Sequence, residues 1–534
     1  MGPSGELATV SLRHPAALFA VLVAIASGLG PAGARATSGS PLSGYDWPTY
    51  GHDYNRTFHG QTTLTQTSVR TLLPKWHFHT GDAVTANPIV VRGSVYVGSW
   101  DGCFYAIDAK SGASRWSFGI DLDQPGISPQ PSPGACPRSV SRQPTDITTD
   151  GGYITSTAAF VPANRKRPDL VVFGGGFTLY ALVANNFVTA NHAFHAGDLF
   201  WKHKYPGTGV GGALKPKDDS RIFSSPAVVG DHVLFSEDAD GNNGFRGYMV
   251  SADLNNGEPQ WVRELDVDTA GKILNNGCGN VWASPTVIAR LGIEVAAASD
   301  CDFNNTAPYH ERMLAVNISD GKIRWIFDPG RVDPSCDWDF GATANLGTKP
   351  DGTPTFLGVG GKDGTYYRVN PYTGKLIWKK NVLFGGFSGG FLGSTAFDGN
   401  RVYGATALGD FGRFEGFGSL GCQPGNPKDQ LIQDPSIHAF DATTGKVEWQ
   451  GYLSQSFGPT TVAGGMTFVG TGITREIQIR DAATGGLIWI LPLIASSDSG
   501  VVVTKNSIVF GTGSSEQGVP DGVWAYTPLG AAVE

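Results

Sequence analysis

Charged residues are scarce in this sequence: Asp, Glu, Lys and Arg make up 16% of its 534 residues. A disordered chain would be richer in charge and poorer in aromatic residues, whereas this one has 13 tryptophans and 29 phenylalanines. The net charge of −8 argues against a nucleic-acid-binding surface, so no nucleic-acid partner is expected. The 74 glycines are typical of many short strands joined by Gly-rich turns.

Closely spaced cysteines are also lacking, because none of the six cysteines forms a C-x-x-C pair. This argues against a zinc ribbon or a thioredoxin-like site, and without C-x-x-C-H no covalent c-type haem is encoded in this sequence. Six cysteines allow fifteen disulfide arrangements, which sequence alone does not resolve. Pairing of sequence neighbours would give Cys103–Cys136, Cys278–Cys301 and Cys336–Cys422.

Long apolar runs are lacking except near the N-terminus, where Arg13 and His14 precede an apolar run that ends at Ala26. Small residues at Ala34 and Ala36 then offer a cleavage site, so residues 1–36 are predicted to be a signal peptide. An uncleaved membrane anchor is the alternative, but the run is short for a span. The mature protein is expected to be secreted or periplasmic, with no transmembrane anchor.

A repeated unit that ends in tryptophan is the strongest positive signal. Its clearest copies are DGCFYAIDAKSGASRW ending at Trp116, KDGTYYRVNPYTGKLIW at Trp378, SIHAFDATTGKVEW at Trp449 and REIQIRDAATGGLIW at Trp489. Each copy has an alternating strand, a turn with Gly where φ must be positive, and a second strand carrying the tryptophan. Two more strands precede each unit, the first often starting with Ser-Pro or a similar pair, as at Ser225-Pro226. Four strands per unit predict the blade of a β-propeller.

The count of units predicts an all-β fold of eight blades. Seven units end in tryptophan, and an eighth, which begins near Ser499, lacks its last strand. The strand around Trp76 can supply it, so the N-terminal strand should complete the last blade and remove open sheet edges. The expected organisation is residues 1–36 as signal peptide, 37–70 as a segment leading into the propeller, and 71–534 as one propeller domain. Gly/Pro-rich stretches at 120–150, 203–220 and 409–435 are predicted loops, where function tends to lie.

The repeat resembles that of the PQQ quinoproteins, which include alcohol dehydrogenases that use pyrroloquinoline quinone (PQQ) and calcium, and the segment at 46–57 is similar to the start of that family. The resemblance implies PQQ and calcium as cofactors, an alcohol or sugar alcohol as substrate, and a separate electron acceptor. Within it, Trp282 in GNVWASPTV would lie beneath the cofactor, as a flat indole suits a planar quinone. Asn242 and Asp300 match positions that ligate calcium.

Further positions follow from the same resemblance, nearest to polyvinyl-alcohol-dehydrogenase-like members. Glu311 falls where these members have the catalytic base, and Arg331 lies near a usually basic position that contacts the quinone. Asp339, in CDWDFGATANL, matches a further family segment and is assigned to cofactor binding. Arg142 follows Cys136 in a loop where the dehydrogenases often have adjacent cysteines and then an arginine; this chain has one cysteine there.

Plainer interpretations stand beside these assignments. Trp282 could pack between blades, Asn242 could shape a Gly-rich turn, and Asp300 and Glu311 could be solvated loop carboxylates. The same repeat occurs in non-catalytic propellers, including the outer-membrane barrel-assembly lipoprotein. The alternative function is therefore a scaffold that binds a protein or glycan outside the cytoplasm.

Overall fold

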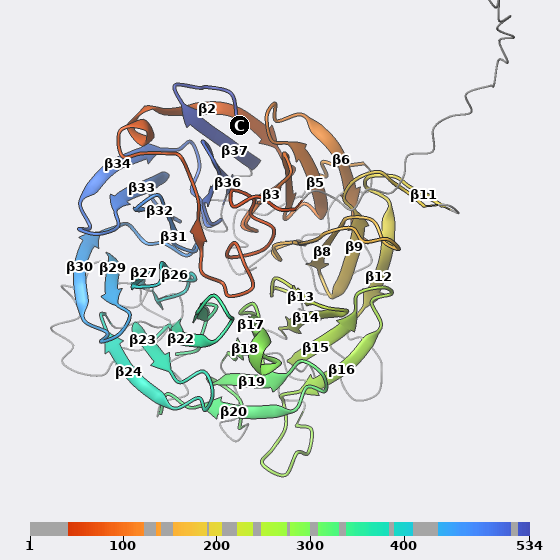
Figure 1. Cartoon of the computed structure of the whole chain (residues 1–534), viewed down its shortest axis with the longest axis vertical. Helices are drawn as coiled ribbons and strands as arrows, with labels where there is room; N and C mark the ends of the chain where they lie inside the picture. The colour runs from red at the N-terminus through yellow and green to blue at the C-terminus, as the bar shows by residue number, and fades with distance from the viewer. Residues whose placement is uncertain are drawn as a thin grey trace, which may run out of the picture.

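A computed structural model describes residues 41–121, 135–139, 153–189, 192–205, 222–238, 247–274, 278–299, 308–330, 338–383, 389–408, 436–513 and 522–534. Within these residues the chain forms eight sheets of at least four strands, arranged in a ring (Figure 1). The predicted all-β, eight-bladed propeller is confirmed. The two described helices, η1 (Ser68–Thr71) and η2 (Ala289–Leu291), are single 3-10 turns. No helix among the described residues has the length and apolar character to cross a membrane.

Each blade begins with a short, buried strand beside the central axis. From blade one to blade eight these inner strands are β3 (Ile89–Val91), β7 (Ala159–Val161), β13 (Ala227–Val229), β17 (Thr286–Ile288), β21 (Asn345–Thr348), β26 (Ala396–Phe397), β31 (Thr461–Ala463) and β35 (Val502–Val503). The second strands are β4 (Ser94–Gly98), β8 (Leu170–Gly175), β14 (His232–Glu237), β18 (Ile293–Ala297), β22 (Pro354–Gly360), β27 (Arg401–Ala405), β32 (Met466–Gly470) and β36 (Ile508–Thr512).

The outer half of each blade carries the repeat. The third strands are β5 (Cys103–Asp108), β9 (Thr178–Val183), β15 (Tyr248–Asp253), β19 (Met313–Asn317), β23 (Thr365–Val369), β29 (Ser436–Asp441), β33 (Glu476–Asp481) and β37 (Gly522–Pro528). The outermost are β6 (Ser114–Gly119), β12 (Leu199–Lys204), β16 (Pro259–Glu264), β20 (Ile323–Phe327), β24 (Leu376–Asn381), β30 (Val447–Tyr452), β34 (Leu487–Pro492) and β2 (Leu72–His79). Short extra strands are β1 (His59–Gly60), β10 (Phe187–Val188), β11 (Ala193–Phe194), β25 (Gly389–Gly390) and β28 (Ala407–Leu408).

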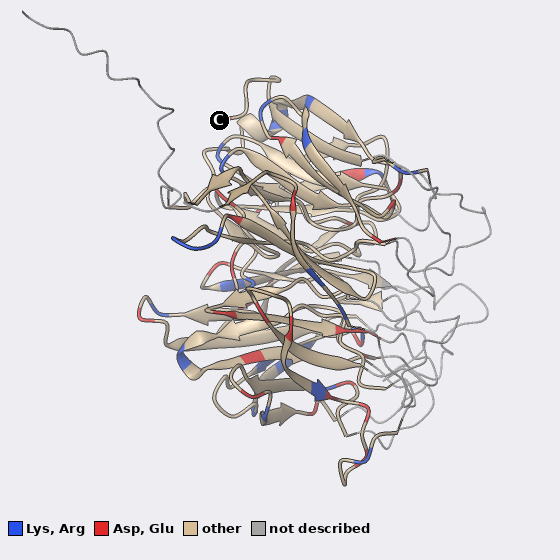
Figure 2. Cartoon of the chain, turned by 90° about the vertical axis from the view of Figure 1, so that its right-hand side faces the viewer, with Lys and Arg blue, Asp and Glu red and all other residues tan. Residues whose placement is uncertain are grey.

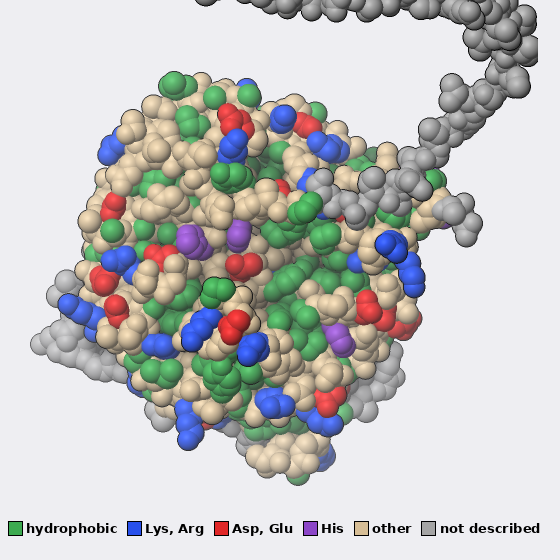
Figure 3. All heavy atoms as spheres, viewed as in Figure 1, with side chains coloured by type: hydrophobic (Ala, Val, Ile, Leu, Met, Phe, Trp, Pro, Cys, Tyr) green, Lys and Arg blue, Asp and Glu red, His purple; other side chains and the backbone are tan. Residues whose placement is uncertain are grey.

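Strand direction separates the two faces of the ring, which Figure 2 views from the side. Neighbouring strands within a blade are antiparallel, so the turns after the first and third strands lie on one face. The connections after the second and fourth strands lie on the other face, which we call the loop face. The turns on the opposite face are short, as at 289–292 and 318–322 in blade four. Acidic and basic side chains are interspersed over the face of the described residues that Figure 3 shows.

The ring is closed by the two ends of the propeller sequence. Strand β2 pairs antiparallel with β37, from Leu72 opposite Pro528 to His79 opposite Gly522. The predicted closure of the last blade by the N-terminal strand is therefore confirmed. Because of this pairing, the edges of β2 and β37 that face each other are not left open.

The repeat tryptophans hold each blade to the next. Trp449 of blade six donates its indole N–H to the carbonyl of Ala482 in blade seven at 3.0 Å. The turn glycine of that blade, Gly485, has φ +73°, and a Cβ there would lie 2.5 Å from the Trp449 ring. Glycine is needed for both reasons, since a side chain would strain the turn and displace the indole. The same donor and acceptor positions recur at Trp76, Trp116, Trp201, Trp261, Trp325 and Trp378.

Trp489 differs from this pattern for a topological reason. Its indole N–H is buried and has no acceptor among the described residues. The next blade is the eighth, whose third and fourth strands belong to opposite ends of the sequence. That blade has no hairpin turn to offer a carbonyl, so closure of the ring costs one docking hydrogen bond.

A second set of contacts joins the blades at the axis. The backbone N–H two residues before an inner strand donates to the side-chain oxygen at the same position in a neighbouring blade, over 2.7 to 3.0 Å. We call this set the axial ring: Asn87 to Thr157, Thr157 to Ser225, Ser225 to Ser284, Ser284 to Thr343, Thr343 to Ser394, and Gly500 to Asn87. This is why serine and similar residues recur before the inner strands.

The N-terminal segment runs inside the ring, crossing its middle in Figure 1. Residues 46–63, which we call the axial segment, bond to inner strands of most blades. Contacts run between Trp47 and Val90, Pro48 and Phe160, Tyr54 and Val287, Asn55 and Leu346, Thr57 and Phe397, Phe58 and Val462, and Thr63 and Lys505. The sequence predicted only that this region leads into the propeller.

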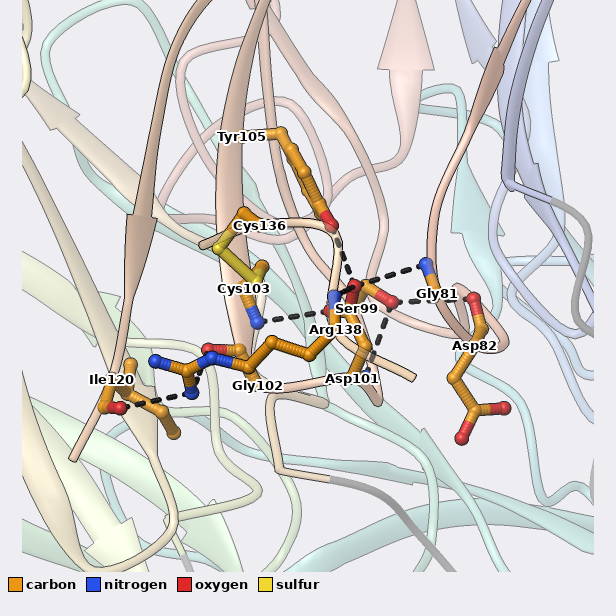
Figure 4. The surroundings of a disulfide bond; sticks show 10 residues. All are labelled: Gly81, Asp82, Ser99, Asp101, Gly102, Cys103, Tyr105, Ile120, Cys136 and Arg138. Carbon is orange, nitrogen blue, oxygen red and sulfur yellow. Dashed lines mark hydrogen bonds between the residues drawn. A yellow bond between two sulfur atoms is a disulfide. The ribbon is translucent and has the colours of Figure 1, made fainter. Parts of the chain in front are cut away.

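The disulfide Cys103–Cys136 joins β5 to the segment 135–139, which confirms the predicted pairing (Figure 4). Beside it, the buried Asp101 carboxylate accepts hydrogen bonds from the Gly81 and Cys103 N–H groups and from the Tyr105 hydroxyl. Cys278 is also disulfide-bonded. Cys301, Cys336 and Cys422 lie outside the described residues, so the other two pairings stay predictions.

Glu294 is a fully buried carboxyl between blades three and four. On β18 it lies opposite Val287 and Val316, which pack against apolar residues of blade three. It has no hydrogen-bond partner among the described residues, and burial raises its pKa well above the ordinary value of 4.5. The protonated form is therefore favoured in the folded protein.

This burial predicts a pH dependence of stability. Below about pH 4.5 Glu294 is protonated both folded and unfolded; above it, only the unfolded chain releases the proton. The free energy of unfolding should fall by up to about 1.4 kcal/mol per pH unit from this residue as pH rises towards the folded pKa. The unfolding free energy of Glu294→Gln minus that of wild type should therefore be larger at pH 8 than at pH 4. Urea unfolding at the two pH values measures this difference.

Glu258→Gln is the matched control, because the Glu258 side chain is 65% exposed. It should leave the dependence on pH unchanged. A difference between Glu294→Gln and wild type that does not vary with pH would show that Glu294 is not a buried acid.

Candidate functional site

The loop face of blades four and five brings together an indole, a carboxylate and an ammonium. Trp282 lies in the segment that leads into β17, and Asp339 in the segment that leads into β21. Lys362 lies in the turn between β22 and β23. All three therefore come from connections on the same face, next to the axis.

Direct contacts link the three side chains. Lys362 Nζ lies 3.0 Å from Asp339 Oδ1, and the Trp282 indole N–H donates to Asp339 Oδ2 at 3.3 Å. The Lys362 ammonium also lies 5.6 Å from the centre of the Trp282 ring, within range of a cation–π interaction. The Lys362 backbone N–H donates to the Asp339 carbonyl at 2.9 Å, which fixes the turn against the segment.

The ion pair is buried, with 8% of the Lys362 side chain and 2% of the Asp339 side chain exposed. Removing one partner of such a pair costs about 3–5 kcal/mol, because the other charge is left buried. A buried pair is weak evidence for a stability role, since apolar residues of similar volume often serve as well.

Trp282 differs from the repeat tryptophans. Its N–H reaches a carboxylate instead of a turn carbonyl. Gly341 makes room for it, because a Cβ at Gly341 would lie 2.3 Å from the edge of the ring. These contacts reach from blade four to blade five, so they are compatible with packing between blades as well as with a functional site.

Glu311 lies at the same face, just before β19. It is 6% exposed and has φ +50°, a left-handed conformation that is uncommon for residues other than glycine. Its N–H donates to the Ser299 carbonyl, and the Ser299 N–H donates to the carbonyl of Asn280, two residues before Trp282. Backbone hydrogen bonds thus tie Glu311 to the segment of Trp282, whereas the described side-chain contacts of Trp282 go to Asp339 and Lys362.

The other predicted site residues lie outside the described residues. These are Arg142, Asn242, Asp300 and Arg331. Within the described ranges, no group of three or more His, Cys, Asp or Glu side chains is arranged to hold a metal ion.

Sequence reasoning missed Lys362. Its signal was available in the repeat, where Asp-Gly starts the third strand at Asp101 and at Asp363. The residue before that Asp is Trp100 in blade one and Lys362 in blade five. Asp363 itself has a structural role, since it accepts hydrogen bonds from the Thr365 N–H and the Tyr367 hydroxyl.

Comparisons with known families agree with this fold. A family model described as "Glucose/ethanol/alcohol dehydrogenase, beta-propeller domain" matches residues 47–381. A second, "Outer membrane protein assembly factor BamB", matches residues 362–519.

Two curated proteins are similar in sequence. The polyvinylalcohol dehydrogenase of a Pseudomonas species is 23% identical over 475 residues, which are 82% of this chain and 65% of that protein. The quinohemoprotein alcohol dehydrogenase of Comamonas testosteroni is 22% identical over 376 residues, 63% of this chain and 46% of that protein. The chain thus spans less than two thirds of the length of either relative.

Solved structures share the fold. A crystal structure of the quinohemoprotein alcohol dehydrogenase from Comamonas testosteroni has a TM-score of 0.67 at 17% identity, covering 92% of this chain and 81% of that one. A europium-containing methanol dehydrogenase also has a TM-score of 0.67, at 16% identity, covering 91% of this chain and 98% of that one.

Proposed function

The chain belongs to the PQQ quinoprotein family of alcohol dehydrogenase-like β-propellers, and we propose that it is a PQQ- and calcium-dependent dehydrogenase. Its substrate is an alcohol or sugar alcohol, oxidised outside the cytoplasm, and its electrons pass to a separate acceptor. The observation that supports this most is the buried Asp339–Lys362 pair against the Trp282 ring. Export rests on the signal-like residues 1–36.

The described residues fit a planar, anionic quinone. Trp282 offers a partly exposed indole, and Lys362 offers an ammonium 5.6 Å from the centre of its ring. Gly341 lets the ring lie against the backbone, where any side chain would push it away. Trp282 and Lys362 are therefore the residues proposed to hold PQQ, together with Arg142 and Arg331 as predicted from the sequence.

The reaction needs a proton acceptor for the alcohol hydroxyl. When bound, PQQ would supply the quinone that takes up the hydride from the alcohol carbon. Asp339 is suited to accept the hydroxyl proton, because contacts to the Lys362 ammonium and to the indole N–H fix the positions of its two oxygens. The charges of Asp339 and Lys362 are largely buried, so water screens their electrostatic interactions little.

Two carboxylates compete for the role of base. Glu311, the residue assigned from the resemblance, lies on the loop face with a strained backbone. Asp339 makes the described contacts to Trp282 and Lys362. We favour Asp339 on these contacts and keep Glu311 as the second candidate.

Calcium is proposed from Asn242 and Asp300. Asp300 directly follows Ser299, whose N–H is bonded to Asn280 in the segment of Trp282. A carboxylate and an amide oxygen are suitable ligands for calcium, which polarises a bound carbonyl as a Lewis acid.

The alternative, a non-catalytic scaffold, is favoured by one comparison. The BamB family model matches residues 362–519, the region with the most regular copies of the repeat. A scaffold needs the docking tryptophans and the axial ring, but it has no use for the pair Asp339 and Lys362.

The function is tested by adding PQQ and calcium to purified protein. We expect binding of about one PQQ per chain, quenching of tryptophan fluorescence, and dye reduction with members of a panel of alcohols and sugar alcohols. Lys362→Met, which keeps the aliphatic stem, should weaken PQQ binding. Wild-type protein that neither binds PQQ nor reduces the dye would favour the scaffold.

Neutral variants separate the two candidate bases. Asp339→Asn should lower kcat on the order of 100-fold or more, because the proton acceptor is lost while the shape is kept. Glu311→Gln should lower kcat far less. PQQ titration of both variants checks that the cofactor still binds, and the reverse ranking of kcat would assign the base to Glu311.

A third variant addresses the metal. Asp300→Ala should raise the calcium concentration needed for half-maximal activity by about tenfold or more, because a charged ligand is lost. Asp351→Ala, on an exposed turn of the opposite face, is the control. Equal calcium titration curves for Asp300→Ala and wild type would exclude Asp300 as a ligand.

A further inference from the structure

Arg56 lies at the centre of the propeller and is 0% exposed. It belongs to the axial segment, and its guanidinium contacts the axial ends of two blades. Nε donates to the Pro285 carbonyl of blade four at 2.9 Å, and Nη2 donates to the Ser225 carbonyl of blade three at 3.1 Å. Nη1 donates back to the Tyr50 carbonyl at 2.6 Å and to Thr49 Oγ1 at 3.1 Å.

The backbone of Arg56 reaches blade five as well. Its carbonyl accepts a hydrogen bond from the Asn345 side chain at 2.6 Å, and Asn345 also donates to the Thr395 carbonyl of blade six. Asn345 is the first residue of β21, two residues after Thr343 of the axial ring. One residue thus touches three consecutive blades from inside the channel.

These contacts lie directly next to the candidate site in the sequence. Pro285 is three residues after Trp282, and Asn345 is six residues after Asp339. The hydrogen bond between Trp282 and Asp339 crosses from blade four to blade five. Its geometry therefore depends on the relative position of the two blades that Arg56 joins.

The charge of Arg56 makes its contacts with the neighbouring blades costly to break. Burial lowers the pKa of Arg56 to about 10, so it stays a cation at neutral pH. Its hydrogen-bond acceptors are carbonyls and one hydroxyl. A buried cation that loses such acceptors carries a large desolvation cost, so displacement of blade three or blade four from the Arg56 side chain is strongly opposed, while the Arg56 carbonyl holds blade five through Asn345.

We propose that Arg56 is a positioning residue, which fixes blades four and five relative to each other and thereby sets the contact of Trp282 with Asp339. The axial segment then serves as an internal support for the site. Its effect on PQQ binding rests on the proposed function, whereas its effect on the two blades does not.

Arg56→Met tests this role, because it keeps the length of the side chain but removes the charge and the donors. Arg480→Met is the matched control: Arg480 is 8% exposed and bonds to the carbonyls of Gly485 and Tyr452, far along the ring in blades six and seven. Both variants lose buried hydrogen bonds, so both should melt at a lower temperature. Only one of them should disturb the site.

Amide hydrogen exchange is the first measurement, and it requires no cofactor. Arg56→Met should speed exchange in peptides that cover 280–288 and 340–348, whereas Arg480→Met should speed it only in blades six and seven. Equal protection of 280–288 and 340–348 in Arg56→Met and wild type would overturn the proposal. This result stands even if the wild type binds no PQQ.

PQQ affinity is the second measurement. Arg56→Met should bind PQQ about tenfold or more weakly, as small misplacements of a site have effects of this size or larger. Arg56→Lys should recover part of the affinity, because it restores the charge and some donors. If Arg56→Met and Arg480→Met bind PQQ with the same affinity, Arg56 has only a general structural role and does not position the site.

A milder variant covers the case in which Arg56→Met does not fold. Tyr50→Phe removes only the hydroxyl that is 2.9 Å from Ser394 Oγ, where Ser394 accepts the N–H of Thr343 in the axial ring. It should speed exchange in 340–348 and leave 476–492 of blade seven unchanged. No change in 340–348 would contradict support of blade five by the axial segment.

Discussion

The hydrogen bonds at the axis are the constraint on which this propeller depends. The repeat tryptophans other than Trp489 each donate a hydrogen bond to the next blade near the rim, and the inner strands need contacts of their own near the axis. The axial ring supplies contacts there, because the N–H before six of the eight inner strands bonds to a side-chain oxygen on a neighbouring blade. Serine and threonine suit these positions, since their short side chains reach a neighbouring backbone without filling the channel.

The candidate site lies next to the axial ring in the sequence. Ser284 and Thr343, which are bonded to each other, follow Trp282 and Asp339 by two and four residues. The indole and the carboxylate therefore lie close in sequence to two bonded members of the axial ring. Lys362 is brought in separately, by a turn whose N–H is bonded to the Asp339 carbonyl. Such support from regular strands holds a site more precisely than loops alone.

The sequence reveals the blades because their contacts repeat. A tryptophan, a turn glycine and a buried alternating strand occur in nearly every unit, so Trp116, Trp378, Trp449 and Trp489 are enough to set the period. Pairing of Cys103 with Cys136 followed from proximity in sequence, and it is present. Arg56 could not be found in this way, and Lys362 shows in the sequence only as the residue before Asp-Gly in one unit of the repeat. The contacts that each makes occur once, between segments far apart in the sequence, and no local pattern encodes those contacts.

The distinction between repeated and single contacts also bears on function. The tryptophans and the axial ring would serve any propeller of this kind, catalytic or not. The pair Asp339 and Lys362 occurs in one place, next to the one tryptophan whose N–H is bonded to a carboxylate among the described residues. Burial of both charges is expensive, and apolar residues could fill the same volume at no loss of stability. A cost that the fold does not need is best explained by the chemistry of the site, where a fixed carboxylate and a fixed ammonium face an aromatic ring.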